Sequence, residues 1–118
     1  MESQDVQALL PLPEATFHIL LALVDADRHG YGIIQDVRAR TGGAVTLGAG
    51  TLYRTIQRLL EQGLIQETRD RPPPEDDDDR RRYYRLGPLG RRAAAAELGR
   101  LSGLVKLARA QGLVIEES

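Results

Sequence analysis

A run of ten residues in the middle of the chain constrains the fold more than any other feature. Residues 70–79, with the sequence DRPPPEDDDD, combine three prolines with five successive acids. Proline cannot donate to a strand ladder and adjacent like charges repel one another, so this run can form neither a strand nor a helix. Short strand-like segments flank it at residues 64–69 and 82–86. The sequence therefore predicts a hairpin with a long loop over residues 70–81.

Three stretches ahead of this hairpin have the apolar period of amphipathic helices, over about residues 13–24, 31–41 and 51–62. Gly42-Gly43 and Gly63 end the second and third in the manner of left-handed caps. The predicted apolar positions are Phe17, Leu20, Leu21 and Val24, then Ile33, Ile34 and Val37, then Leu52, Ile56, Leu59 and Leu60.

A longer helical pattern follows the hairpin, over about residues 88–111. Its apolar residues recur at alternating spacings of four and three, which is typical of a coiled-coil seam. They are Ala94, Leu98, Leu101, Val105 and Ala108. A helix of this length would extend roughly 36 Å, more than so small a domain can cover, so we expect a second copy to cover it. The alternative is a helix that folds back on its own domain.

The order of three helices, two strands and a final helix predicts a mainly α (α+β) fold, the winged helix–turn–helix. With 118 residues the chain is the size of one such domain. We expect an N-terminal arm at 1–12, a DNA-binding domain at 13–86 with its wing loop at 70–81, and a dimerisation helix and tail at 87–118.

The third predicted helix stands where a recognition helix would lie. Burying its apolar positions turns Thr51, Arg54, Thr55, Gln57, Arg58 and Glu61 outward and leaves Tyr53 at the edge. Such side chains bind phosphates and read base edges, although an ordinary solvated helix face has the same composition. The DNA-contact candidates on this helix are Thr51, Tyr53, Arg54, Gln57 and Arg58.

Arginines crowd the second strand of the hairpin. Alternation places Tyr84 and Leu86 toward the core and turns the other face outward as a clamp for the phosphate backbone. The candidates there are Arg80, Arg81, Arg82, Tyr83 and Arg85. The alternative is a solvated edge strand protected by charge. The acids at 75–79 either temper DNA affinity or mimic a phosphate chain near these arginines, and the alternative is a disordered, solvated loop.

The formal net charge of −1 hides a segregation of charge along the chain. Residues 38–92 contain 12 arginines and 8 acids, and five of those acids are the run at 75–79. The near-neutral average therefore does not count against DNA binding.

Several function classes are excluded by composition. The chain has no cysteine and only two histidines, His18 and His29, which leaves no material for a thiolate or zinc site. No apolar stretch is long enough to span a bilayer, and the N-terminus lacks a basic region that would indicate a secretory signal. We find no catalytic constellation and expect a cytoplasmic protein that is not an enzyme and uses no cofactor.

Several segments together resemble the PadR family of transcriptional regulators, over about residues 13–92. They are Leu20–Leu23, His29–Ile33, Gly50–Tyr53, then Leu59, Gly63, Leu64 and Ile65, and finally Tyr83–Leu86. The resemblance implies a dimeric repressor in which Thr51 and Tyr53 face DNA, similar to short members with one C-terminal helix. The chain departs from the family pattern at Arg54, where Pro is frequent, and at Gly87, where Thr is usual.

We therefore predict a DNA-binding repressor that binds a pseudo-palindromic operator as a homodimer. Its expected partners are double-stranded DNA and a second copy of the chain, with no membrane, and the sequence leaves open whether a small-molecule inducer binds. The competing interpretation is a winged-helix module that binds protein without DNA, which the acidic wing favours.

Overall fold

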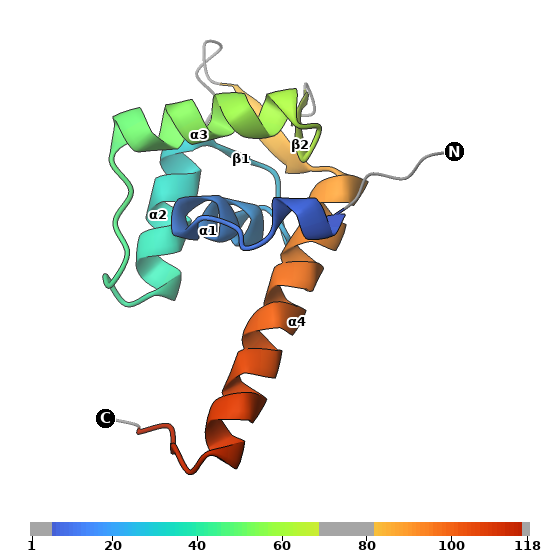
Figure 1. Cartoon of the computed structure of the whole chain (residues 1–118). Helices are drawn as coiled ribbons and strands as arrows, with labels where there is room; N and C mark the ends of the chain where they lie inside the picture. The colour runs from blue at the N-terminus through green and yellow to red at the C-terminus, as the bar shows by residue number, and fades with distance from the viewer. Residues whose placement is uncertain (1–5, 69–81, 117–118) are drawn as a thin grey trace.

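Three helices and a small sheet enclose the core, and a long fourth helix extends away from them (Figure 1). The computed structural model describes residues 6–68 and 82–116. The elements in order are η1 Val6–Leu9, α1 Glu14–Ala22, β1 Arg28–His29, α2 Gly30–Arg40, α3 Ala49–Glu61, β2 Ile65–Thr68, β3 Tyr83–Leu86 and α4 Pro88–Ala110. The winged-helix prediction is confirmed. The loop at 70–81, with Arg80, Arg81 and the acidic run, lies outside the described residues.

The sheet has three antiparallel strands in the order β1-β3-β2. The predicted hairpin is present, with Ile65 opposite Leu86 and Thr68 opposite Tyr83. The third strand, β1, pairs His29 with Tyr83 on the other side of β3. The sequence predicted only two strands. It missed β1 because two residues are too few to give a periodic signal.

Helix α1 turns a different face to the core from the predicted one. Ile19 and Leu20 are fully buried and Leu23 nearly so, whereas the exposed fraction of Val24 is 41%. Phe17 and Leu21 are only partly buried. Apolar residues surround this helix, so its own period cannot select the buried face, and the positions of α2, α3 and α4 decide it.

Helices α2 and α3 follow the predicted pattern closely. Ile33, Val37, Leu52 and Leu59 are buried between them and α1. Gly42 and Gly43 follow α2 with φ angles of 61° and 86°, the left-handed values that the glycine pair suggested. Thr55, expected on the outer face of α3, is buried with an exposed fraction of 6%. It lies one turn before Leu59, on the flank of the apolar stripe.

Helix α4 belongs to the domain only at its beginning. Gly90 and Ala93 are buried against the rest of the fold, and the later turns extend away from it (Figure 1). Ala94, predicted to lie in the dimerisation seam, is buried in the core with an exposed fraction of 7%. The first turns of α4 pack against the domain, so any exposed apolar face of this helix begins only after them. Across residues 6–68 and 82–116, no helix is both long and apolar enough to cross a membrane.

The segment before α1 is attached to α4 by a buried carboxylate. Glu97 has an exposed fraction of 3% and accepts a hydrogen bond from the backbone N–H of Leu12 at 3.2 Å. Arg100 donates to both Glu97 oxygens, at 2.9 and 2.7 Å. The hydrogen bonds from Arg100 outweigh the opposing effect of burial and hold the pKa of Glu97 below its usual range.

Candidate nucleic-acid interface

The outer face of α3 is an exposed polar helix face of the winged domain. This helix runs along the side of the domain opposite to the direction in which α4 extends (Figure 1). Exposed on it are Thr51, Tyr53, Arg54, Gln57 and Arg58, as the sequence predicted. Gln57 donates to Glu61 at 3.3 Å across one turn. Neither Arg54 nor Arg58 has a carboxylate partner in the described part of the chain.

Tyr53 connects α3 to the first turn of α2. Its ring lies over Gly30 so closely that a Cβ built on this glycine would come within 2.7 Å of the Tyr53 Cζ atom. Gly30 itself is buried, whereas the exposed fraction of Tyr53 is 51%. The absence of a side chain at Gly30 therefore allows the end of a solvent-accessible tyrosine side chain to lie against the first turn of α2.

His29 begins α2 as its N-cap. Its Nδ1 atom accepts a hydrogen bond from the backbone N–H of Gly32 at 3.0 Å. Its ring also meets the ring of Tyr83 edge-on, with the centroids 5.1 Å apart. The sequence pattern did not indicate a cap at His29. The available signal was a side chain with a hydrogen-bond acceptor directly before the first residue of a helix, where it can bind a free backbone N–H of the first turn.

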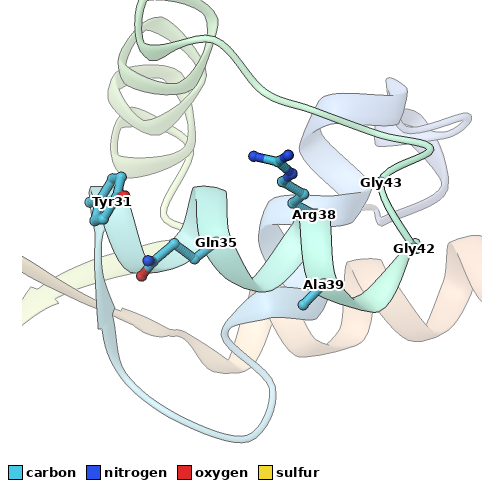
Figure 2. Close-up of a pocket in the computed structure, with 6 residues that line it drawn as sticks. All are labelled: Tyr31, Gln35, Arg38, Ala39, Gly42 and Gly43. Atoms are coloured by element: carbon cyan, nitrogen blue, oxygen red, sulfur yellow. The ribbon is translucent and has the colours of Figure 1, made fainter.

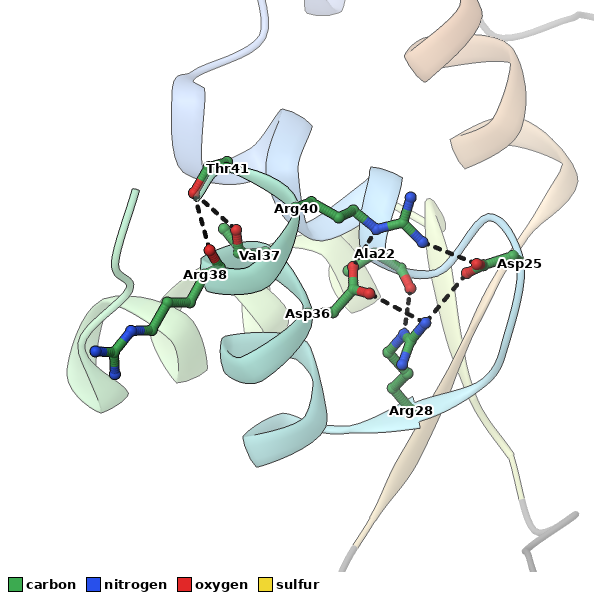
Figure 3. A network of polar contacts seen from close by, with 8 residues as sticks. All are labelled: Ala22, Asp25, Arg28, Asp36, Val37, Arg38, Arg40 and Thr41. Atoms are coloured by element: carbon green, nitrogen blue, oxygen red, sulfur yellow. Dashed lines mark hydrogen bonds and ion pairs between the residues drawn. The ribbon is translucent and has the colours of Figure 1, made fainter. Parts of the chain in front are cut away.

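Arginines on the other flank of α2 are engaged by acids (Figure 3). Arg40 donates to Asp36 at 2.6 Å and to Asp25 at 2.8 Å. Arg28 lies 3.2 Å from both acids and donates through Nε to the carbonyl of Ala22 at 2.7 Å. Burial opposes the charged form of Asp25, but hydrogen bonds from Arg40 and Arg28 prevail and lower its pKa. These charges are neutralised within the fold.

The predicted clamp on β3 is only partly exposed. Tyr83 is buried, with an exposed fraction of 5%, so its expected position on an outer face was wrong. Arg85 makes a bidentate ion pair with Asp27, the shortest bond being 2.9 Å. Tyr83 and Tyr84, on opposite faces of β3, are both buried, and Tyr83 packs against the ring of His29. Burial on both faces is not foreseen by a strict alternation of buried and exposed residues. Arg82 remains exposed, 3.8 Å from Glu67 on β2.

A hollow of about 560 Å³ lies on the exposed side of α2 (Figure 2). Tyr31, Gln35 and Arg38 line it from successive turns, and Ala39, Gly42 and Gly43 complete it. All six residues are exposed. Sequence reasoning did not select this row, although its i, i+4, i+7 spacing places the three long side chains on one helix face.

The described residues contain no group of three or more His, Asp or Glu side chains that could hold a metal ion. Their polar side chains on α2 and α3 instead offer guanidinium, amide and hydroxyl donors. Such donors suit an extended anionic partner.

One known protein family matches the chain. The family described as transcriptional regulator PadR-like matches residues 19–96, about two thirds of the chain. No sequence among the curated proteins matches the chain.

Solved structures share the fold. A transcriptional regulator from Clostridium thermocellum is 24% identical, with a TM-score of 0.68 over 97% of this chain and 100% of its own. A PadR family transcription regulator from Clostridium difficile R20291 is 23% identical, with a TM-score of 0.68 over 83% of this chain and 97% of its own. PadR from Bacillus subtilis, solved in complex with operator DNA, is 18% identical. Its TM-score is 0.62 over 75% of this chain and 48% of its own.

The match of the family over most of the winged domain and the shared fold lead to one assignment: this chain belongs to the PadR-like family of transcriptional regulators.

Proposed function

We propose that the chain is a repressor that binds a pseudo-palindromic operator as a homodimer, with α3 in the major groove. One observation carries this proposal: the outward arginines of α3, Arg54 and Arg58, have no acidic partner among the described residues. Elsewhere in the winged domain, Arg28, Arg40 and Arg85 are paired with acids. Free guanidinium groups on a recognition helix can donate to phosphate oxygens and guanine edges.

The family and one solved relative support the same role. PadR from Bacillus subtilis was solved in complex with operator DNA. By analogy, we assign base or phosphate contacts to Thr51, Tyr53, Arg54, Gln57 and Arg58, with Arg82 at the edge of the wing. Its DNA target would lie in the cytoplasm, where we place the protein.

Dimerisation through α4 follows from the continuation of its apolar face. Gly90, Ala93 and Glu97 face the domain, and the same side of the helix continues beyond it. The exposed fractions are 61% for Leu98 and 41% for Val105, and Leu101 and Ala108 are half-buried. Helix α1 adds a second apolar strip that the core covers only in part, Phe17, Leu21 and Val24. A second copy would cover both strips and place two recognition helices about 34–36 Å apart, one turn of DNA.

The proposal is tested with duplexes selected from a random library of about 30 base pairs, since two half-sites and their flanks need this length. The affinity for the selected duplex is then measured by fluorescence anisotropy at several salt concentrations. The wild-type chain should lose affinity steeply with salt, with a log–log slope of about −0.9 per phosphate contacted.

The double variant Arg54→Ala/Arg58→Ala should bind the selected duplex with an affinity at least about tenfold lower, because each good arginine contact to a base contributes about 1–3 kcal/mol of discrimination. It should elute at the same size as the wild type. Lys106→Ala, which removes one exposed positive charge on distal α4, is the control and should bind normally. If no duplex is enriched and binding is absent even at low salt, the chain is a winged-helix module for a protein partner instead.

A further inference from the structure

We propose that His29 is a pH-sensitive switch, in which protonation of its ring releases the first turn of α2. The proton is taken up by Nδ1, the atom that accepts the hydrogen bond from Gly32. The consequence for DNA binding rests on the proposed function, because the end of the Tyr53 side chain lies against this turn. The switch itself is a property of the fold.

The first argument is the direction of the hydrogen bond at the beginning of α2. The backbone N–H of Gly32 donates to His29 Nδ1 at 3.0 Å, so this nitrogen carries no proton in the folded chain. The imidazole also lies beside Gly32, since a Cβ built on this glycine would stand 3.4 Å from the His29 Cε1 atom. A protonated imidazole has an N–H donor at both nitrogens. Protonation would therefore set two donors against each other and remove the cap.

The second argument is the charge at this helix terminus. The N-terminus of a helix carries a partial positive charge, and the first turn of α2 contains no acidic residue to balance another cation. Arg28 precedes His29 with a full positive charge, and the acids that pair with Arg28 also bind Arg40. The beginning of α2 therefore favours the neutral ring of His29.

The third argument is that histidine titrates in a pH range in which its neighbours do not. The described elements packed around the beginning of α2 contribute Arg28 on β1, Asp36 on α2, Tyr53 on α3, Glu67 on β2 and Tyr83 on β3. Helix α1 adds His18, the only other histidine in the sequence. Guanidinium groups, phenols and carboxylates ordinarily titrate outside the range of about pH 5.5–7.5, whereas histidine titrates at about 6.5. Apart from His18, the charge that changes among these groups in that range is the charge of His29.

The fourth argument is the position of the cap between three elements of the winged domain. Strand β1 leads directly into α2, and His29 lies opposite Tyr83 in β3, with the two rings in edge-on contact. The next residue, Gly30, is buried beneath the end of the Tyr53 side chain. His29 itself is half-buried, so a proton can reach its ring from solvent. Loss of the cap would loosen the turn that holds Tyr53 in place.

The test follows the backbone amide of Gly32 by NMR between about pH 8 and about pH 5.5, a range that spans the ordinary titration of histidine. Because the fold favours the neutral ring, the cap should be complete above about pH 6.5 and should be lost as the pH falls below this value. The amide resonance should then shift in one histidine-like transition, and the protection factor of this amide against solvent exchange should fall with it.

Two variants separate the two histidines. His29→Asn should abolish the transition, because asparagine caps a helix without titrating. His18→Gln is the matched control and should keep the transition, since His29 is then the only histidine left in the chain. This control needs no change at His29, so it remains decisive even if His29→Asn does not fold.

The same transition should reach DNA binding. Between about pH 7.5 and about pH 5.5 at constant salt, the wild type and His18→Gln should lose about three- to tenfold in affinity for the selected duplex, which is the range expected for the loss of one N-cap. His29→Asn should equal the wild type at the higher pH and lose much less at the lower pH. Fluorescence anisotropy gives all of these affinities.

Several results would overturn the switch. The first is a Gly32 amide that does not titrate in His18→Gln, and the second is a transition without loss of protection, because the cap would then stay in place. An equal loss of affinity at low pH in His29→Asn and the wild type would also overturn it. If the wild-type chain binds no duplex at either pH, the proposed function fails, and the titration of the Gly32 amide still supports or overturns the switch by itself.

Discussion

Two glycines, Gly30 and Gly90, each lie against a neighbouring group that leaves no room for a side chain, and the two groups are of different kinds. At Gly90, a Cβ would overlap the carbonyl oxygen of Leu64 and come within 2.9 Å of the Leu86 side chain. At Gly30, the overlapping group is the end of the Tyr53 side chain. The backbone of Leu64 leads into β2 within the packed fold and cannot move aside, whereas the half-exposed side chain of Tyr53 can rotate. The first glycine should therefore matter for stability and the second for the shape of the α2–α3 surface.

Gly90→Ala should destabilise the protein by about 1–3 kcal/mol, the usual cost of overpacking, although alanine favours a helix. The melting temperature should fall clearly in a thermal denaturation experiment followed by circular dichroism. Gly99→Ala is the matched control on the same helix, because nothing lies within 4 Å of its Cβ. That variant should be as stable as the wild type or slightly more so. Equal melting temperatures for the two variants would contradict this account.

Gly30→Ala should leave the fold intact but displace the Tyr53 side chain. We expect a small change in melting temperature and a loss of DNA affinity of several-fold, measured by anisotropy. The effect should vanish in a Tyr53→Ala background, because the alanine then has nothing to displace. An equal loss in both backgrounds would show that Gly30 acts by another route.

Carboxylates join elements that are distant in the sequence. The carboxylate of Glu97 on α4 holds the backbone of Leu12 before α1, and Asp27 before β1 holds Arg85 on β3. Glu97 is the more buried of the two acids, with side-chain exposures of 4% against 30%. Removing a buried partner leaves unsatisfied donors behind. The attachment of the N-terminal segment to α4 should therefore depend on the charge of Glu97.

The lowered pKa of Glu97 predicts the sign of one pH effect. Its interactions stabilise the fold fully above its unfolded-state pKa of about 4.3, and this contribution is lost as the pH falls through the lower folded-state value. Asp25 shifts in the same direction. The melting temperature of the wild type should therefore decrease when the pH is lowered beyond about 4.3.

Glu97→Gln should melt at a lower temperature at neutral pH and lose less stability on acidification, because it has no charge to lose there. Asp25 should preserve part of the acid sensitivity. Glu116→Gln, an exposed change in the C-terminal tail, should follow the wild-type curve. Parallel melting curves for Glu97→Gln and the wild type across this pH range would refute the assignment.

At the scale of the molecule, two surfaces remain uncovered on opposite sides. The polar face of α3 lies on one side of the domain, and the apolar face of α4 extends away from the other (Figure 1). Apolar residues also follow α4, since the exposed fractions of Leu113 and Val114 are 67% and 80%. An apolar surface of this extent is typical of a protein–protein interface. The proposed DNA contact and the proposed self-association would therefore use opposite sides of the molecule.

Val105→Glu should convert the proposed dimer to a monomer, because it places a charge in the apolar face that a second copy would cover. Sedimentation velocity should give twice the chain mass of 13.0 kDa for the wild type and the single mass for the variant. Leu107→Glu is the control, since Leu107 lies on a different side of the same helix and has an exposed fraction of 65%. A dimeric Val105→Glu variant would place the interface elsewhere.

The sequence by itself determined the order, type and approximate ends of the main elements. Period and breakers act locally, so α2, α3, α4 and the hairpin follow from spacing, glycine and proline alone. The outward arginines of α3 follow in the same way, because a single strong apolar stripe leaves one choice of outer face.

Only the tertiary structure decided which faces are covered. By local pattern alone, either residue of several pairs could have faced the core. The pairs are Phe17 or Ile19, Tyr83 or Tyr84, and Thr55 or Tyr53. Their burial depends on neighbours from distant segments. The pairing of Asp27 with Arg85 spans 58 residues, so no local signal separates engaged arginines from free ones. Charge and period are properties of the chain, whereas the availability of a charge is a property of the packed fold.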